Sequence, residues 1–152
     1  MKVIVDADAC PVKDIIIKEA KKKDIPVVLV SSFSHFSSKD LDEHVSVVYV
    51  DSGSDAADFK IVALIDQGDI AVTQDYGLAS LLLPKKCRVL HHKGFEYTGD
   101  NMNHLLETRY IGSMIRKGGG RTKGPKPLSK EDKQSFLGIF KKVISEELSQ
   151  RK

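Results

Sequence analysis

The segment KVIVDADACPVK, residues 2–13, decides the fold of this chain. It begins with a continuous apolar run, residues 3–5, that passes directly into Asp6 and Asp8. A proline, which suits the first turn of a helix, then opens a helical pattern over residues 11–23. A short, fully apolar strand followed at once by a helix is typical of a parallel sheet that is buried on both faces.

The same unit of strand and helix recurs along the first two thirds of the chain. The apolar runs and helical patterns fall in this order: strands 3–5, 26–30, 45–50, 70–73 and 88–91, with helices 11–23, 55–67 and 75–83 between them. Right-handed crossovers between parallel strands place helices on both faces of a sheet. We therefore predict an α/β fold, a three-layer α/β/α sandwich with a mainly parallel sheet of about five strands.

The remaining third has a different composition. Residues 116–128 are rich in glycine and proline and contain no acidic residue, which predicts a loop. Residues 129–150 form a helical pattern whose apolar stripe must pack on something. We therefore predict one domain over residues 1–152, with an α/β core (1–115), a basic Gly/Pro-rich loop (116–128) and a docked C-terminal helix (129–150).

Charge separates these parts of the chain. The net charge is +3, but residues 1–115 hold 13 basic and 17 acidic side chains, whereas residues 116–152 hold 11 and 4. An acidic body with a basic tail favours one site for a cation and another for an anion such as nucleic acid. The alternative is an ordinary solvated basic surface. The expected nucleic-acid contacts are the basic residues of the loop, namely Arg116, Lys117, Arg121, Lys123 and Lys126.

Several classes of protein are excluded. The only two cysteines, Cys10 and Cys87, are too few for a disulfide framework and suit a reducing compartment. No apolar run approaches the roughly 20 residues of a membrane helix, and the N-terminus has no signal-peptide pattern. The sequence therefore predicts a cytoplasmic protein that makes no use of a membrane.

Acidic residues follow the predicted strands at the ends where parallel strands meet. They are Asp6 and Asp8 after the first strand, Asp51 after the third with Asp55 and Asp58 in the next helix, and Asp75 after the fourth. Ligands of open parallel sheets bind at this edge. Carboxylates that lie so close repel one another unless they are protonated or neutralised by a cation, and oxygen ligands suit Mg²⁺ or Mn²⁺.

Each of these acids also has a purely structural interpretation. Asp51 and Asp55 suit a helix N-terminus, and Asp75 suits the N-cap of a short helix. Asp58 lies in line with apolar positions four and seven residues later, where a carboxylate usually has a partner. A packing role is favoured for Cys10. His91 and His92 end the fifth strand, and a satisfied or surface histidine is favoured over a site residue for each.

Five ordered stretches resemble the YaiI/YqxD family, a family of uncharacterised bacterial proteins. They are Asp6-Ala-Asp-Ala-Cys-Pro-Val-Lys13, Asp51-Ser-Gly-Ser-Asp-Ala-Ala-Asp58, Thr73-Gln-Asp75 with Leu78-Ala79, Gly94 to Asn101 with Tyr97-Thr98, and Gly120-Arg-Thr-Lys-Gly-Pro-Lys-Pro127. The resemblance covers nearly the whole chain. The family is similar to the PIN-like nuclease superfamily, whose members place acids after strands one and four and on an intervening helix.

The resemblance implies a PIN-like sheet and a Mg²⁺- or Mn²⁺-dependent nuclease that acts on nucleic acid, with RNA favoured. Matched by position, Asp6, Asp58 and Asp75 are the implied catalytic residues and metal ligands, and Asp8 and Asp55 are further implied ligands. The start of the helix is unusually rich in acids. The choice among Asp51, Asp55 and Asp58 as ligands therefore stays open.

Three other functions fit parts of the pattern. Asp6 and Asp8 with Ser31 or Ser32 imitate a haloacid-dehalogenase-like phosphatase, although Cys10 departs from that pattern. Asp51, Thr73 and Lys93 imitate the order of a receiver domain. The third is a non-catalytic RNA-binding module, which would bind RNA equally well after Asp75→Asn and would cleave it in no metal.

Overall fold

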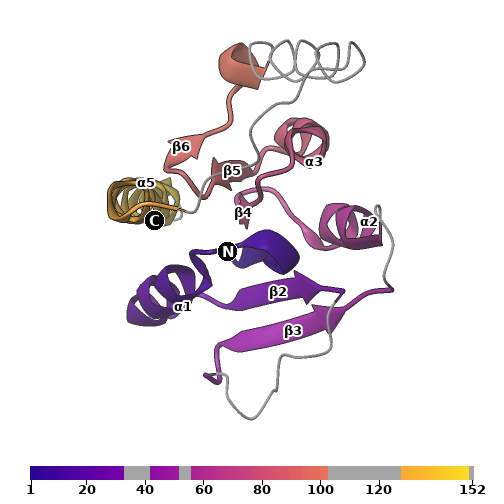
Figure 1. Ribbon diagram of the computed structural model, residues 1–152, viewed down its shortest axis with the longest axis horizontal. Helices are drawn as coiled ribbons and strands as arrows, with labels where there is room; N and C mark the ends of the chain where they lie inside the picture. The colour runs from indigo at the N-terminus through magenta and orange to yellow at the C-terminus, as the bar shows by residue number, and fades with distance from the viewer. Residues whose placement is uncertain (33–41, 52–55, 103–127, 151–152) are drawn as a thin grey trace.

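The computed structural model describes residues 1–32, 42–51, 56–102 and 128–150 (Figure 1). The strands are β1 (Val3–Asp6), β2 (Val27–Ser31), β3 (Val45–Tyr49), β4 (Ile70–Val72), β5 (Arg88–His91) and β6 (Phe95–Glu96). The helices are α1 (Lys13–Lys22), α2 (Ala56–Leu64), α3 (Tyr76–Leu82) and α5 (Lys130–Gln150), with short 3-10 turns η1 (Ala7–Ala9) and η3 (Leu83–Lys85). The predicted alternation of strands and helices is therefore confirmed.

The six strands form one sheet in the order β3-β2-β1-β4-β5-β6. Strands β1 to β5 are parallel, and β6 pairs antiparallel with β5. From β1 the chain moves through α1 to β2 on one side, and after α2 it returns to β4 on the other side. The strand order therefore reverses between β1 and β4, which is the point where open α/β sheets bind ligands.

Both faces of the sheet are covered, as the apolar strands predict. Val3 and Val5 pack in one core with α1 and α5, whereas Ile4 between them packs in a second core with α2 and α3. Figure 1 shows α1 and α5 on one side of the sheet and α2 and α3 on the other. Successive side chains of a strand point to opposite faces, so burial on both faces requires an unbroken apolar run. The α/β prediction with a mainly parallel sheet is confirmed.

The order of the strands excludes the receiver-like alternative. That alternative requires Asp51, after β3, to lie next to Asp6 at the end of β1. In this sheet β3 is an edge strand and β2 separates it from β1. The receiver-type order 2-1-3-4-5 would instead place the third strand beside the first. The receiver interpretation of Asp51, Thr73 and Lys93 is therefore wrong.

Helix α2 ends at Leu64, three residues before the predicted end. The N–H of Asp66 donates to the side chain of Asp69 at 2.8 Å, and the carbonyl of Val62 accepts a hydrogen bond from Lys85 Nζ at 2.6 Å. The next hydrogen bond of the helix would join the N–H of Asp66 to the carbonyl of Val62. It does not form, because both groups bind other partners. Gly68, expected to close the helix, lies in the turn that follows, at φ +86°.

Helix α5 is fixed to the sheet along its length. At its start Ser129 and Asp132 exchange hydrogen bonds between side chain and backbone N–H, as a capping box does. Its apolar stripe is fully buried and consists of Phe136, Phe140, Val143 and Ile144. Near its end Glu146 and Glu147 bind Arg88 of β5, which also holds Glu96 of β6 through two hydrogen bonds of 2.6 and 2.8 Å.

The short strand β6 extends the sheet beyond the five predicted strands. The turn that leads into it needs Gly94, which has φ +100°. A Cβ atom at this position would lie 2.6–2.8 Å from Ser135 Cβ and from the backbone of Ser135 and Phe136 on α5. Glycine therefore allows both the turn and the close approach of α5.

We expect Gly94→Ala to lower the free energy of unfolding by about 2–4 kcal/mol, because a strained φ and a clash with backbone act together. The matched control is Gly138→Ala on α5, where a Cβ atom meets nothing within 4 Å. That change should stabilise the helix by roughly 0.5–1 kcal/mol. Urea denaturation of the two variants measures both values. Equal stability of the variants would contradict this account of Gly94.

Candidate active site

The candidate site lies at the carboxyl ends of β1 and β4, where the strand order reverses. Asp6 is the last residue of β1, and Val5 before it pairs with Val72, the last residue of β4. Thr73 and Asp75 follow β4 directly. The parallel register thus brings Asp6 and Thr73 to the same edge of the sheet, as predicted from the sequence for Asp6 and Asp75.

Thr73 joins the two acids. Its hydroxyl donates a hydrogen bond to Asp6 Oδ2 at 3.0 Å and accepts one from the backbone N–H of Asp75 at 3.0 Å. Thr73 is itself buried and held in place, because its N–H donates to the carbonyl of Leu90 and its carbonyl accepts from the Tyr97 hydroxyl at 3.1 Å. Sequence reasoning gave Thr73 a role only in the receiver-like alternative and did not predict that it joins Asp6 to Asp75. The signal was the position of a hydroxyl residue between a buried strand and Asp75.

Asp75 is the N-cap of α3. Its Oδ1 accepts hydrogen bonds from the N–H groups of Gly77 at 2.8 Å and Leu78 at 3.2 Å. The structural interpretation of Asp75 is therefore correct. It does not exclude a second role, because both bonds use the same carboxylate oxygen. The cap fixes Asp75 beside Thr73 and hence at the same edge as Asp6.

Asp8 is exposed in the turn η1 and turns toward the end of β2. It accepts a hydrogen bond from the Ser31 hydroxyl at 2.7 Å and others from the backbone N–H and the hydroxyl of Ser32. Partial burial opposes ionisation, but the bonds from Ser32 and Ser31, with the charge of Lys13, hold the pKa of Asp8 below its usual range. Asp8 thus stays ionised and fastens β1 to β2.

Asp6 is in the opposite electrostatic situation. Burial raises its pKa, the hydrogen bond from Thr73 lowers it, and the nearby charges of Asp75 and Asp8 raise it further. The net effect is a pKa above the usual range. An ionised carboxylate at this position is therefore destabilised by its surroundings, and a nearby cation would relieve both burial and repulsion.

Of the remaining predicted acids, Asp58 lies in the first turn of α2 and is half-buried. Asp51 is exposed and lines a shallow hollow with Tyr49 and Phe59, at the edge strand β3. Asp55 lies outside the described residues. The predicted nucleic-acid contacts lie outside them too, and these are Arg116, Lys117, Arg121, Lys123 and Lys126.

The donor set at this edge consists of carboxylate oxygens, which suits Mg²⁺ or Mn²⁺ by chemistry. Within residues 1–32, 42–51, 56–102 and 128–150, no three His, Cys, Asp or Glu side chains are grouped so that they could hold a metal ion. Mg²⁺ does not require such a group, because it keeps several waters and is commonly bound by one or two carboxylates together with substrate phosphates. Asp6 and Asp75 are the residues that would hold it.

Aromatic rings flank the site at the end of β5. His91 is buried, stacks on Phe95 at 4.6 Å between ring centroids and lies 6.4 Å from the ring of Tyr76. Its Nδ1 accepts a hydrogen bond from the N–H of Lys93 at 3.0 Å. Burial, with the charges of His92 and Lys93, lowers the pKa of His91 to about 4, so the ring is neutral. His91 is a satisfied histidine, as favoured from the sequence.

Cys10 is buried beside the site and packs in the core formed with α1 and α5. Burial raises the pKa of its thiol to about 11, so it is not a reactive thiolate. The burial of Cys10 and its raised pKa agree with the packing role favoured from the sequence. In the portion of the chain that the structure describes, no helix has the length and apolar character needed to cross a bilayer.

The comparisons with known proteins concern nearly the whole chain. The sequence profile described as "Uncharacterized BCR, YaiI/YqxD family" matches residues 4–146. UPF0178 proteins from Bacillus anthracis and Bacillus cereus are each 59% identical over 145 residues, which covers 95% of this chain and 99% of each relative. A crystal structure of Rae1 (YacP) from Bacillus subtilis is similar at 17% identity and a TM-score of 0.42, covering 96% of this chain and 99% of that chain.

The raised pKa of Asp6 predicts how stability depends on pH. The pKa of Asp6 is higher in the folded than in the unfolded protein. Its favourable contribution to the free energy of unfolding is therefore complete below the unfolded-state pKa and is lost as the pH rises through the folded-state pKa. At neutral pH in EDTA, Asp6→Asn should therefore raise Tm by roughly 2–4 °C, equivalent to about 1 kcal/mol. Asparagine keeps an acceptor for Thr73. The gain should vanish below about pH 3.9, the ordinary aspartate pKa.

The control is Asp24→Asn, at an exposed position with φ +53° that asparagine tolerates. It should leave Tm unchanged across the same pH range. Thermal unfolding followed by circular dichroism measures both variants. An Asp6→Asn protein less stable than the wild type at neutral pH would show that ionised Asp6 is not destabilising.

Proposed function

The chain belongs to the YaiI/YqxD family, and from the acidic edge of its sheet we propose that it is a metal-dependent nuclease that hydrolyses phosphodiester bonds, with RNA as the substrate. The observation that carries the proposal is the unit of Asp6, Thr73 and Asp75. A half-buried carboxylate with a raised pKa is tied through one hydroxyl to a second carboxylate, at the point where the strand order reverses. Perturbed carboxylates at such a point favour a catalytic role.

Mg²⁺ or Mn²⁺ supplies Lewis-acid chemistry and neutralises charge on a phosphodiester when bound. Asp6 and Asp75 hold the cation in this proposal, and Asp58 on α2 completes or orients the site. Asp8 and Asp55 are further ligands in the same proposal. Thr73 keeps Asp6 Oδ2 and the backbone of Asp75 in a fixed relation, which limits the rearrangement needed for binding. Water is the nucleophile, so no side chain forms a covalent intermediate.

The phosphatase alternative shares Asp6 and Asp8 but needs a different role for each. Asp6 would attack phosphorus and Asp8 would donate a proton as general acid. A general acid works best when its pKa lies near the working pH. The pKa of Asp8 is lowered instead, and Ser31 and Ser32 use its carboxylate as an acceptor. These contacts favour the nuclease. Fluoroberyllate trapped on Asp6 would favour the phosphatase.

Cleavage of a labelled single-stranded RNA in Mn²⁺, Mg²⁺ or EDTA tests the nuclease directly. We expect cutting in either metal, none in EDTA, and a loss of at least about 10²-fold in Asp75→Asn, because one charged ligand of the cation is removed. Asparagine is as good an N-cap as aspartate, so α3 should remain intact. Asp24→Asn, which removes an exposed carboxylate before β2, is the control and should retain full activity.

The outcomes of this experiment separate the functions. RNA that is bound but never cut by the wild-type protein in any metal would make the non-catalytic RNA-binding module the better function. Cutting that survives Asp75→Asn would mean that the site is wrongly placed or that another nuclease is present.

Substitutions in the basic Gly/Pro-rich loop (residues 116–128) test whether RNA is the substrate. Replacement of Arg121, Lys123 and Lys126 together by glutamine should weaken RNA binding and reduce the slope of log Kd against log salt by about 2, since each phosphate contact of a single strand contributes about 0.7. Three exposed lysines elsewhere, Lys18, Lys60 and Lys142, provide a control with the same loss of charge. Fluorescence anisotropy at several salt concentrations gives the slopes. Identical slopes for both triple variants would contradict a specific role for this stretch.

A further inference from the structure

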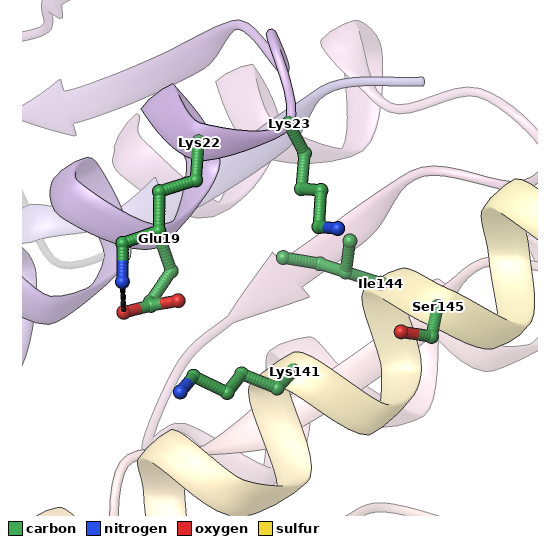
Figure 2. Close-up of a pocket in the computed structure, with 6 residues that line it drawn as sticks. All are labelled: Glu19, Lys22, Lys23, Lys141, Ile144 and Ser145. Carbon is green, nitrogen blue, oxygen red and sulfur yellow. Dashed lines mark hydrogen bonds and ion pairs between the residues drawn. The ribbon is translucent and has the colours of Figure 1, made fainter.

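A second charged feature lies away from the acidic edge, in a hollow of about 300 Å³ between α1 and α5 (Figure 2). Helix α1 starts near the carboxyl end of β1 and runs back to the amino end of β2, so its last residues lie at the opposite edge of the sheet from Asp6. We call this feature the α1–α5 hollow. Its lining residues are Glu19, Lys22, Lys23, Lys141, Ile144 and Ser145.

The charges in the α1–α5 hollow do not balance. Lys22 Nζ lies 3.1 Å from Glu19 Oε1, so this pair is neutral. Lys23 and Lys141 remain, and neither makes an ion pair with any acid in the described part of the chain. In Figure 2, Lys23 extends from the end of α1 toward Ile144 on α5, and Lys141 extends from α5 into the space between the helices. Within the described residues, the lining of the hollow therefore includes two lysines that have no ion-pair partner.

Helix electrostatics account for only one of these lysines. Lys23 follows α1 directly, where a cation offsets the negative C-terminal end. Lys141 lies in the middle of α5, more than two turns from either end, where the helix dipole gives no preference for a cation. Lys141 is exposed, as Lys23 is, and both line the hollow with buried Ile144 and exposed Ser145, so their ammonium groups are accessible to an anion that enters it.

We propose that the α1–α5 hollow binds a phosphate group, which accepts hydrogen bonds from Lys23 Nζ, Lys141 Nζ and the Ser145 hydroxyl. Ammonium groups bind phosphate oxygens as compact charges with several donors, and a hydroxyl adds a directional bond. The volume lies at the lower end of the range for ligand sites, so it suits a phosphate with a small substituent better than a large cofactor. The ion pair with Lys22 keeps the Glu19 carboxylate from repelling the anion.

The phosphate can belong to a small phosphorylated compound or to the backbone of a nucleic acid. The proposal does not depend on hydrolysis, because the α1–α5 hollow shares no residue with the acidic edge. Its test is therefore made as a binding measurement in EDTA, in which the proposed nuclease is inactive. Failure of one proposal then leaves the other standing.

The experiment compares two double variants that lose the same charge. Lys23→Met with Lys141→Met empties the hollow of its free cations but keeps apolar stems of similar length. Lys18→Met with Lys142→Met is the control, because these exposed lysines come from the same two helices and do not line the hollow. Calorimetry with inorganic phosphate and pyrophosphate measures one arm, and anisotropy with a labelled single-stranded RNA measures the other. Circular dichroism verifies that both variants are folded.

We expect the hollow variant to bind phosphate or pyrophosphate at least about tenfold more weakly than the wild type, and the control to change by less than about twofold. If RNA uses the hollow, the hollow variant alone also shows a salt slope smaller by about 0.7–1.4. If the hollow variant loses affinity for phosphate or pyrophosphate but binds RNA as the wild type does, the ligand of the hollow is a small phosphorylated compound. Two outcomes would overturn the proposal. In the first, the hollow variant and the control weaken binding equally. In the second, the wild-type protein binds neither phosphate nor pyrophosphate, and the hollow variant binds RNA as well as the wild type does.

Discussion

The pairing of β1 with β4 is the constraint on which the rest of the molecule depends. Both strands are buried on both faces, so helices must cover the sheet on each side of them. After β1 the chain continues to β2 on one side of the pair, and after β4 it continues to β5 on the other side. This pairing places Asp6 beside Thr73, and the hydrogen bond between their side chains fixes the strand ends at the reversal point. The acidic edge is thus a consequence of how the sheet is wound and not of a dedicated loop.

Three of the acids at this edge, Asp6, Asp8 and Asp75, are stabilised in different ways. Asp8 is compensated by Ser31 and Ser32, and Asp75 by the N–H groups that begin α3. Burial raises the pKa of Asp6 above its usual range, the hydrogen bond from Thr73 offsets this only in part, and the charges of Asp75 and Asp8 add to the rise. The fold therefore holds Asp8 and Asp75 in place through hydrogen bonds, and it destabilises the ionised form of Asp6 beside them. That distribution is expected where a cation, when bound, contributes to stability as well as to chemistry.

Much of this could be predicted from the sequence, because apolar runs bounded by acids report strand ends directly. The α/β class, the parallel sheet and the shared edge of Asp6, Asp8 and Asp75 follow from that pattern. Strand β6 could not be predicted, since two residues show no periodicity. The bridging role of Thr73 and the partners of Asp8 depend on contacts between residues 23 to 67 positions apart. The α1–α5 hollow joins residues more than a hundred positions apart, which no local pattern reports.

The anchoring of α5 has a consequence for the basic segment before it. Gly94 holds the first half of this helix close to the turn after β5, and Arg88 holds its last half. On the other side of the segment, Met102 is buried in the core formed with α2 and α3. Residues 103–127 are therefore joined at both ends to fixed parts of one body. The residues that flank this segment lie in different cores, Met102 with α2 and α3 and Leu128 with α1 and α5, so the chain between them has to connect opposite faces of the same sheet.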